Sequence, residues 1–452
     1  MDTGTLAERL ADYVCGLTFE DLPADAVTKA KDVIAHDLAV AVAGSRSSES
    51  AQALAFARGL GGSPGRARVI GTTESFGPLD ATFVNAVMMR TLRQEDSILP
   101  SFIHPGPILI PAALAIADEA GVTGADLITA LVAGYDVLGT LAGGDWSWNT
   151  GARTSSHVFG AFGSAVVTAR LLGCDRTQTA KAVGYAGNLG AMITYGFENH
   201  QYGLVARNGM TAAFLGAAGC PARPDALEGP YGFYATQLSR MPDDLEQRMD
   251  DLGRRFEIMT SILKPHPSTA INLVPTRLLE ELLAEQGIAG DDVATVVVSR
   301  SRQIDLVPTL HSTGPWESAV QTTSSLPFAL AAVLLDGSVT AKRLNRPDAP
   351  DILERARDIR IDLFDDPDLL RHGIELTTRT GTSVSGTADV GILRPPRPAD
   401  LLGDDGIAAI GRAHAERLLQ IVAELETCAS VDELTDCLIP DHETLTGPEG
   451  DR

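Results

Sequence analysis

The first half of the chain repeats apolar residues at intervals of three and four positions, the spacing of one face of an α-helix. Several of these segments are also rich in alanine on every side, as is typical of helices buried among other helices. Glycine or proline separates one segment from the next. The pattern predicts helices over Leu6–Leu17, Ala24–Val42, Ser48–Leu60, Leu79–Leu92, Pro107–Ala120, Gly124–Leu141, Val158–Leu172, Arg176–Ala191 and Arg207–Ala218.

Beyond Lys264 the pattern changes to that of a mixed structure. A β-branched run and two segments that alternate at period two predict strands, and one continuous apolar run between them predicts a buried helix. The strands are expected at Val293–Ser299, Ile359–Phe364 and Ile374–Arg379, and the helix at Leu326–Leu335.

Proline-rich sequences on both sides of this mixed region mark domain boundaries. We therefore predict a mainly α protein with an all-helical domain over residues 1–267 and an α+β domain over 268–397. Residues 398–452 are expected to form C-terminal helices, one of them over Gly406–Leu425, that return to the helical domain.

Composition narrows the class of protein. The 452 residues carry 36 Lys and Arg against 59 Asp and Glu, a formal net charge of −23. Such a balance disfavours nucleic acid and anionic membrane surfaces as partners. The N-terminus shows no cationic stretch before an apolar run, and the most apolar stretches, near Ile108–Ala117 and Leu326–Leu335, are shorter than a membrane span. Five scattered cysteines indicate no disulfide framework, so we expect a cytoplasmic protein.

One segment concentrates ionisable groups between two apolar helices. Burying such groups without a purpose is costly, so a loop of this kind is a candidate site. A surface loop with an ordinary capping histidine is the alternative. The residues concerned are Arg90, Arg93, Glu95, Asp96, Ser97 and His104, the last fixed by a His-Pro-Gly turn.

Three further polar turns are candidates, although each alone is more often structural. Lys264 and His266 lie at the proposed domain boundary, where a lysine can hold a carboxylate. His157 stands in a hydroxyl-rich entry to a helix. The third turn carries Glu198, His200 and Arg207 and is expected to end at a helix N-terminus, where anions are favoured. No H-E-x-x-H motif is present, and we predict no metal site.

Taken together, these segments resemble the MmgE/PrpD family, which includes 2-methylcitrate dehydratase, cis-aconitate decarboxylase and iminodisuccinate epimerase. The resemblance implies a large helical domain with a smaller α+β lid, a homodimer, and catalysis without metal or organic cofactor. It is carried by His36–Gly44, Gly65–Gly71, Asn85, Glu95-Asp96-Ser97, His104-Pro-Gly106, Phe159-Gly160, Leu171–Gly173, Lys264-Pro265, Ser325–Leu330 and Leu335–Gly337.

The resemblance also implies an active site between the helical domain and the lid. The family's acid-acid-Thr and His-Pro-Gly segment falls on Glu95, Asp96, Ser97 and His104, and its lysine before proline falls on Lys264.

Other positions depart from the family pattern. Arg90 and Arg93 stand where the family has His and Asp, Glu198 stands where it has Lys, and Thr154 stands where it has His, with His157 about one helical turn further on. Because several of these changes reverse charge, they predict a substrate other than 2-methylcitrate or cis-aconitate.

The leading functional hypothesis is a lyase that performs β-elimination on a small anionic substrate. His104 would be the general acid/base, because imidazole titrates near neutral pH. Asp96 would orient it or bind a substrate hydroxyl, and Lys264 with Arg90, Arg93 or Arg207 would hold the anion. Alternatives are an epimerase with His157 or Glu198 as second base, a decarboxylase, and an inactive binding protein.

Overall fold

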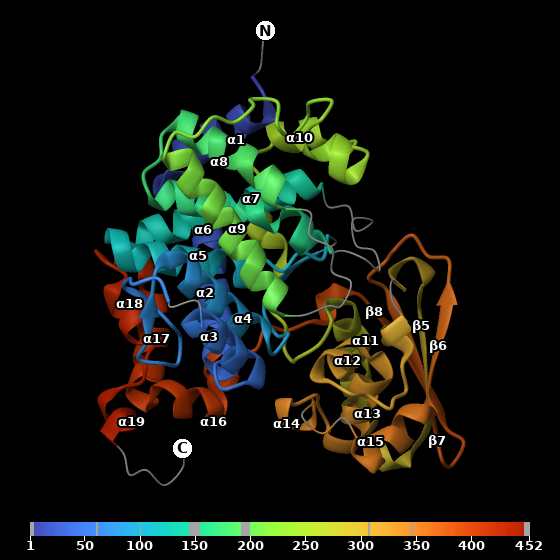
Figure 1. The fold of residues 1–452 in the computed structure, drawn as a ribbon. Helices are drawn as coiled ribbons and strands as arrows, with labels where there is room; N and C mark the ends of the chain where they lie inside the picture. The colour runs from blue at the N-terminus through green and yellow to red at the C-terminus, as the bar shows by residue number, and fades with distance from the viewer. Residues whose placement is uncertain are drawn as a thin grey trace. The chain divides into compact units, whose positions relative to one another are not determined.

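The computed structural model describes residues 4–59, 62–99, 101–143, 154–190, 199–305, 308–344, 346 and 348–446. The chain divides into two units (Figure 1). Unit 1 comprises residues 1–263 and 396–452, and unit 2 comprises residues 264–395. The predicted domain boundaries, 268 and 397, lie within a few residues of this division.

Unit 1 is helical. Its N-terminal segment contains α1 (Leu6–Gly16), α2 (Ala24–Gly44), α3 (Ser48–Gly59), α4 (Pro78–Arg90), α5 (Gly106–Ala120), α6 (Gly124–Ala142), α7 (Ser155–Leu171), α8 (Arg176–Leu189), α9 (His200–Ala217) and α10 (Leu245–Asp250). Two short antiparallel pairs interrupt the helices: β1 (Ala67–Arg68) with β2 (Ser75–Phe76), and β3 (Ser97–Ile98) with β4 (Ser261–Ile262). The predicted helix ends at Leu60 and Ala191 lie outside the described residues.

Local sequence explains several helix starts. Thr123 caps α6 and forms a capping box with Asp126, and Asp175 does the same for α8 with Gln178. Close packing needs small residues as well: a Cβ on Gly209 of α9 would lie 2.4 Å from the carbonyl oxygen of Ala161 in α7. The two helices therefore pack almost backbone to backbone.

Helix α6 is the most apolar long helix of the described residues. By length and composition alone it could cross a membrane. However, 89% of its most apolar window is buried inside the protein, where it packs against α7. Burial of this extent is typical of a core helix.

The C-terminal segment of unit 1 contains α16 (Pro398–Ile410), α17 (Arg412–Ala423), α18 (Asp432–Asp436) and α19 (His442–Thr446). Helix α16 packs against α2, so the two ends of the chain share one core. The single helix predicted over Gly406–Leu425 is wrong, because the chain breaks at Gly411, whose φ is 88°.

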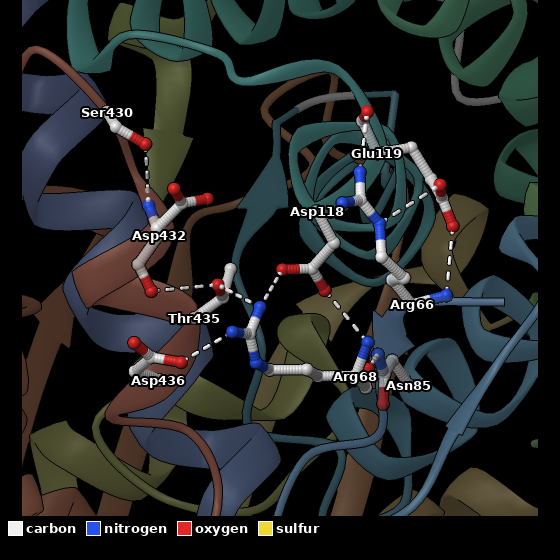
Figure 2. Close-up of polar contacts among 9 residues, drawn as sticks. All are labelled: Arg66, Arg68, Asn85, Asp118, Glu119, Ser430, Asp432, Thr435 and Asp436. Carbon is white, nitrogen blue, oxygen red and sulfur yellow. Dashed lines mark hydrogen bonds and ion pairs between the residues drawn. The ribbon is translucent and has the colours of Figure 1, made fainter.

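Arg68 ties the two segments of unit 1 together (Figure 2). Its guanidinium pairs with Asp118 near the end of α5 and with Asp436 of α18 at 2.5 Å, and it donates to Thr435 Oγ1 at 3.0 Å. Asp118 is almost fully buried, so this arginine neutralises a carboxylate that water does not reach.

Unit 2 is an α+β structure with its own apolar core. Its sheet has the order β6-β5-β7-β8; β5 runs parallel to β6 and antiparallel to β7. Helices α11 and α13 supply apolar residues that join those of β5 and β7 in the core. The elements are α11 (Ala270–Gln286), β5 (Val293–Ser301), α12 (Ala319–Ser324), α13 (Leu326–Asp336), α14 (Ala341–Leu344), α15 (Pro350–Arg355), β6 (Ile359–Phe364), β7 (His372–Thr378) and β8 (Ser383–Ala388).

Candidate active site

The loop between α4 and α5 is folded tightly and buried. The β3 strand within it pairs with β4, and Ile98 N donates to Ile103 O at 2.8 Å. Arg93 and Phe102 have φ values of 52° and 56°, in the left-handed region that L-residues avoid at a cost of about 1–2 kcal/mol each. Backbone strain of this kind clusters at functional sites. The alternative of an ordinary surface loop is therefore wrong.

Glu95 is the centre of the site. Its side chain is fully buried and forms an ion pair with Arg90 at the end of α4. The Oε1 atom of Glu95 lies 3.3 Å from Nδ1 of His104, and Asp96 O lies 3.2 Å from the same nitrogen. Two acceptors at Nδ1 favour the tautomer with the proton there, which puts the basic lone pair on Nε2.

Asp96 is placed differently from the prediction. Its carboxylate accepts hydrogen bonds from Tyr135 Oη at 2.7 Å, Ser261 Oγ at 2.5 Å and Gly106 N at 2.9 Å. These donors hold the carboxylate in the interior, so the side chain that contacts His104 is Glu95. Asp96 meets Nδ1 of His104 through its backbone carbonyl.

A second acid lies beside Asp96. Asp37, in the middle of α2, is fully buried, and its Oδ1 accepts the backbone N–H of Asp96 at 3.0 Å. A Cβ on Gly106 would meet both carboxylates, so only glycine fits between them. Burial and the neighbouring negative charge raise the pKa of Asp37 well above its ordinary value, and burial also raises the pKa of Asp96.

Arg90 and His157 contact the ring of Tyr202, and Arg93 lies near Arg90. The Arg90 guanidinium carbon lies 4.3 Å from the ring centroid, and the His157 ring meets its edge at 4.8 Å. Burial and the adjacent Arg90 charge lower the pKa of Arg93 to about 9. Burial lowers the pKa of His157 to about 3, with both arginines adding to the effect, so His157 is neutral at physiological pH.

Three predicted residues have structural partners elsewhere in unit 1. Ser97 Oγ donates to Ile103 O at 3.3 Å and so closes the loop. The His200 ring stacks on Phe83 at 6.5 Å. Arg207 pairs with Asp80 at 3.5 Å, ten residues before Arg90 on α4, which is about 15 Å along the helix.

The expectation that Arg207 stands at a helix N-terminus is wrong. Helix α9 begins at His200 and continues through Arg207. The earlier start follows from burial, since Tyr202, Val205 and Ala206 are buried at helical spacing. Similarly, α7 begins at Ser155, which puts His157 in its first turn.

The remaining predicted residues lie elsewhere. Lys264 and His266 are buried and stand at the start of unit 2. Burial lowers the pKa of His266 to about 4. Glu198 lies outside the described residues.

Sequence reasoning missed Tyr202 and Asp37. Tyr202 was inside a segment already considered, but only its charged neighbours were selected. The spacing of Tyr202 with Val205 and Ala206 was an available signal of a buried helix face. Asp37 offered another signal, an acid within the long apolar stretch of α2.

Comparison with known proteins defines the class to which this fold and site belong. A profile of the MmgE/PrpD N-terminal domain matches residues 8–245, and the chain belongs to this family. Cis-aconitate decarboxylase of Aspergillus terreus is 23% identical over 95% of this chain and 94% of its own length. Another A. terreus protein of that name is 26% identical over 62% of this chain. The match covers only 60% of that relative's own length. Human cis-aconitate decarboxylase is 23% identical over 80% of this chain and 78% of its own length.

Proposed function

We propose that the protein is a lyase that acts on a small anionic substrate by β-elimination without a cofactor. The observation that carries the proposal is the buried group of His104, Glu95 and Arg90 with Arg93 beside it. It combines one imidazole held by a carboxylate with two guanidinium groups. Proton abstraction next to a carboxylate needs a positioned base and cations for the developing charge.

In this mechanism Nε2 of His104 takes the proton from the carbon next to the substrate carboxylate. The C–H electron pair becomes the new double bond as the C–O bond to the β-hydroxyl breaks. The imidazolium returns its proton to the departing hydroxide, so the net loss is one water. Glu95, 3.3 Å from Nδ1, stabilises the transient imidazolium, and the arginines stabilise the enolate.

Decarboxylation is the second candidate, favoured by the names of the relatives. There the bond to a carboxylate breaks, carbon dioxide leaves, and His104 would protonate the carbanion that remains. Both reactions belong to the lyase class and use the same imidazole and cations.

Epimerisation needs two bases, and the candidates for the second are His157 and Glu198, of which Glu198 lies outside the described residues. A pKa near 3 makes His157 a weak base at neutral pH. A site that has lost catalysis and only binds an acid is the further alternative, and His104→Ala would leave its binding unchanged.

The test is to incubate the protein with citrate, 2-methylcitrate, cis-aconitate and related hydroxy acids. Ultraviolet absorbance follows gain or loss of the enoate, mass spectra in deuterated water follow proton exchange, and carbon dioxide is measured directly. We expect loss of water without exchange in the recovered substrate. Exchange without loss of a group would support epimerisation, and release of carbon dioxide would support decarboxylation.

Variants assign the roles. His104→Ala and Glu95→Gln are expected to lower turnover at least a hundredfold, whereas His414→Gln, in α17, leaves it unchanged. Turnover by His104→Ala equal to that of the parent would contradict the mechanism. Lys264→Ala tests the carboxylate contact that is proposed for Lys264 from its place at the predicted domain boundary and from the family resemblance. The proposed homodimer predicts a native mass of about twice 47.6 kDa in light scattering.

A further inference from the structure

Tyr202 contacts the candidate active site on three sides. It lies in the first turn of α9 and is buried. Arg90 from the end of α4 covers the face of its ring at 4.3 Å, and His157 from α7 meets the ring edge-on at 4.8 Å with an interplanar angle of 69°. The His104 ring lies 6.3 Å away. One side chain therefore connects groups from three different parts of unit 1.

The ring fixes the Arg90 guanidinium from one side while Glu95 holds it by an ion pair. A cation over an aromatic face is attracted most strongly when water is excluded, as it is here. A guanidinium held in this way has lost its rotamer freedom before any ligand arrives.

Two buried nitrogens lie next to this ring and point to a ligand. Within the described part of the chain, Arg90 Nε and His157 Nε2 have no hydrogen-bond partner. Both side chains are more than nine-tenths buried, and buried polar atoms are nearly always paired. An anionic oxygen can accept from a guanidinium N–H, and an imidazole N–H in the matching tautomer can donate to the same group.

The hydroxyl of Tyr202 has a separate connection. It hydrogen bonds with the side chain of Ser156, and Ser156 Oγ accepts the backbone N–H of His104 at 2.9 Å. Burial raises the pKa of Tyr202, so the phenol keeps its proton and the hydrogen bond at neutral pH.

We propose that Tyr202 is a positioning residue with two separable roles. Its ring pre-organises Arg90 and His157 to receive an anionic group of the substrate, and its hydroxyl fixes His104 through Ser156. The identity of the substrate rests on the proposed function, whereas the arrangement does not.

The experiment separates ring from hydroxyl. Tyr202→Phe keeps the ring, so KM should stay within threefold while kcat falls at least tenfold and the pH profile of kcat shifts. Tyr202→Leu removes the ring, so KM should rise at least tenfold as well. Equilibrium binding of cis-aconitate as probe should weaken only in Tyr202→Leu.

Tyr234→Phe is the matched control, since Tyr234 is equally buried and its hydroxyl donates to Leu141 O at 2.7 Å. It should change neither KM nor kcat. If both Tyr202 variants alter KM and kcat by the same factor as this control does, the proposal is overturned.

Unfolding experiments test the role of Tyr202 even if the proposed function is wrong. If the parent protein turns over none of the acids, the denaturation midpoints of single and double variants are compared instead. The single variants are Arg90→Met, Tyr202→Phe and Tyr202→Leu. Arg90→Met and Tyr202→Leu should be non-additive in denaturation midpoint, whereas Arg90→Met and Tyr202→Phe should be nearly additive. Additive effects in the first pair would overturn the proposal even without a known substrate.

Discussion

The charged side chains of the candidate active site are mostly buried, and their partners come from distant parts of the chain. The sequence identified Arg90, Glu95 and His104 because they lie close together in one short segment of the chain. It could not identify Tyr202 or Asp37 as their partners, since helix packing brings these residues in from α9 and α2. It also could not decide which of two adjacent acids contacts His104. That choice depends on Tyr135 and Ser261, which bind Asp96 from distant parts of the chain.

His157 should make the free energy of unfolding depend on pH. Its pKa is about 3 in the folded protein and 6.5 ordinarily, so between these values the unfolded chain binds more protons. Stability is then complete above pH 6.5 and falls as pH falls, by about 2 kcal/mol between pH 7 and 5. Urea denaturation at both pH values should show this loss to be smaller by about that amount in His157→Gln. Equal losses in the two proteins would contradict the assignment.

The carboxyl pair of Asp37 and Asp96 should act in the opposite direction. Both pKa values are raised, so the folded protein binds more protons than the unfolded chain, and stability falls as pH rises above about 3.8. Asp37→Asn keeps an acceptor for Asp96 N and removes one charge. We expect it to be at least as stable as the parent at pH 7.5, with a flatter pH dependence in chemical denaturation.

Asp96→Asn is the comparison for this pair. It weakens the hydrogen bonds from Tyr135, Ser261 and Gly106 and should cost about 1–3 kcal/mol at pH 7.5. A loss of that size in Asp37→Asn would contradict this prediction, because it would mean that the Asp37 carboxyl group stabilises the native protein at pH 7.5.

At the scale of elements, prediction succeeded where the pattern was local. The strand over Ile359–Phe364 is confirmed residue for residue, and β5 extends two residues beyond its predicted end. Helix α11 was missed, because Pro275 inside it and the prolines before it are typical of a break. The break at Gly411 was missed for the opposite reason. Apolar spacing continues across it, and the residue that lies against Gly411, Asp441, is distant in the sequence.

Gly411→Ala tests how closely Asp441 packs against Gly411. A Cβ at this position would lie 2.0 Å from Asp441 Oδ2, and φ is 88°. Gly121→Ala, at the end of α5, is the control: φ is 66°, but a Cβ there meets nothing within 4 Å. Gly121→Ala should cost about 1 kcal/mol for the left-handed backbone. Gly411→Ala should cost a further amount of about 1–3 kcal/mol, because its φ of 88° and ψ of 156° lie in a region used almost only by glycine and because its Cβ would meet Asp441. Equal shifts of the thermal midpoint in the two variants would show that the Asp441 side chain moves away from the new Cβ at no cost.

At the scale of the molecule, the two units differ in continuity. Unit 2 is one uninterrupted segment with its own core and sheet, whereas unit 1 is made from both ends of the chain. The changes in sequence pattern and the proline-rich segments predict boundaries that lie within a few residues of this division. The contacts that join the ends, such as those of Arg68, were not predictable, because they depend on partners more than 300 positions away.

This difference predicts how fragments behave. Residues 264–395 expressed alone should fold, giving dispersed amide resonances and a cooperative thermal transition. Residues 1–263 alone lack α16, the packing partner of α2, and leave Arg68 without Asp436. They should aggregate or remain partly unfolded. A stable, monomeric 1–263 fragment would show that the C-terminal helices are dispensable for the core.

The division of unit 1 into two segments also has a consequence for synthesis on the ribosome. Residues 1–263 emerge first with the surface that α16 will cover still exposed. At about 5–20 residues per second, translation of the intervening unit takes on the order of ten seconds. During that delay the apolar side of α2 is open to other nascent chains. Chaperone capacity during expression should therefore limit the yield of this protein more than its final stability does.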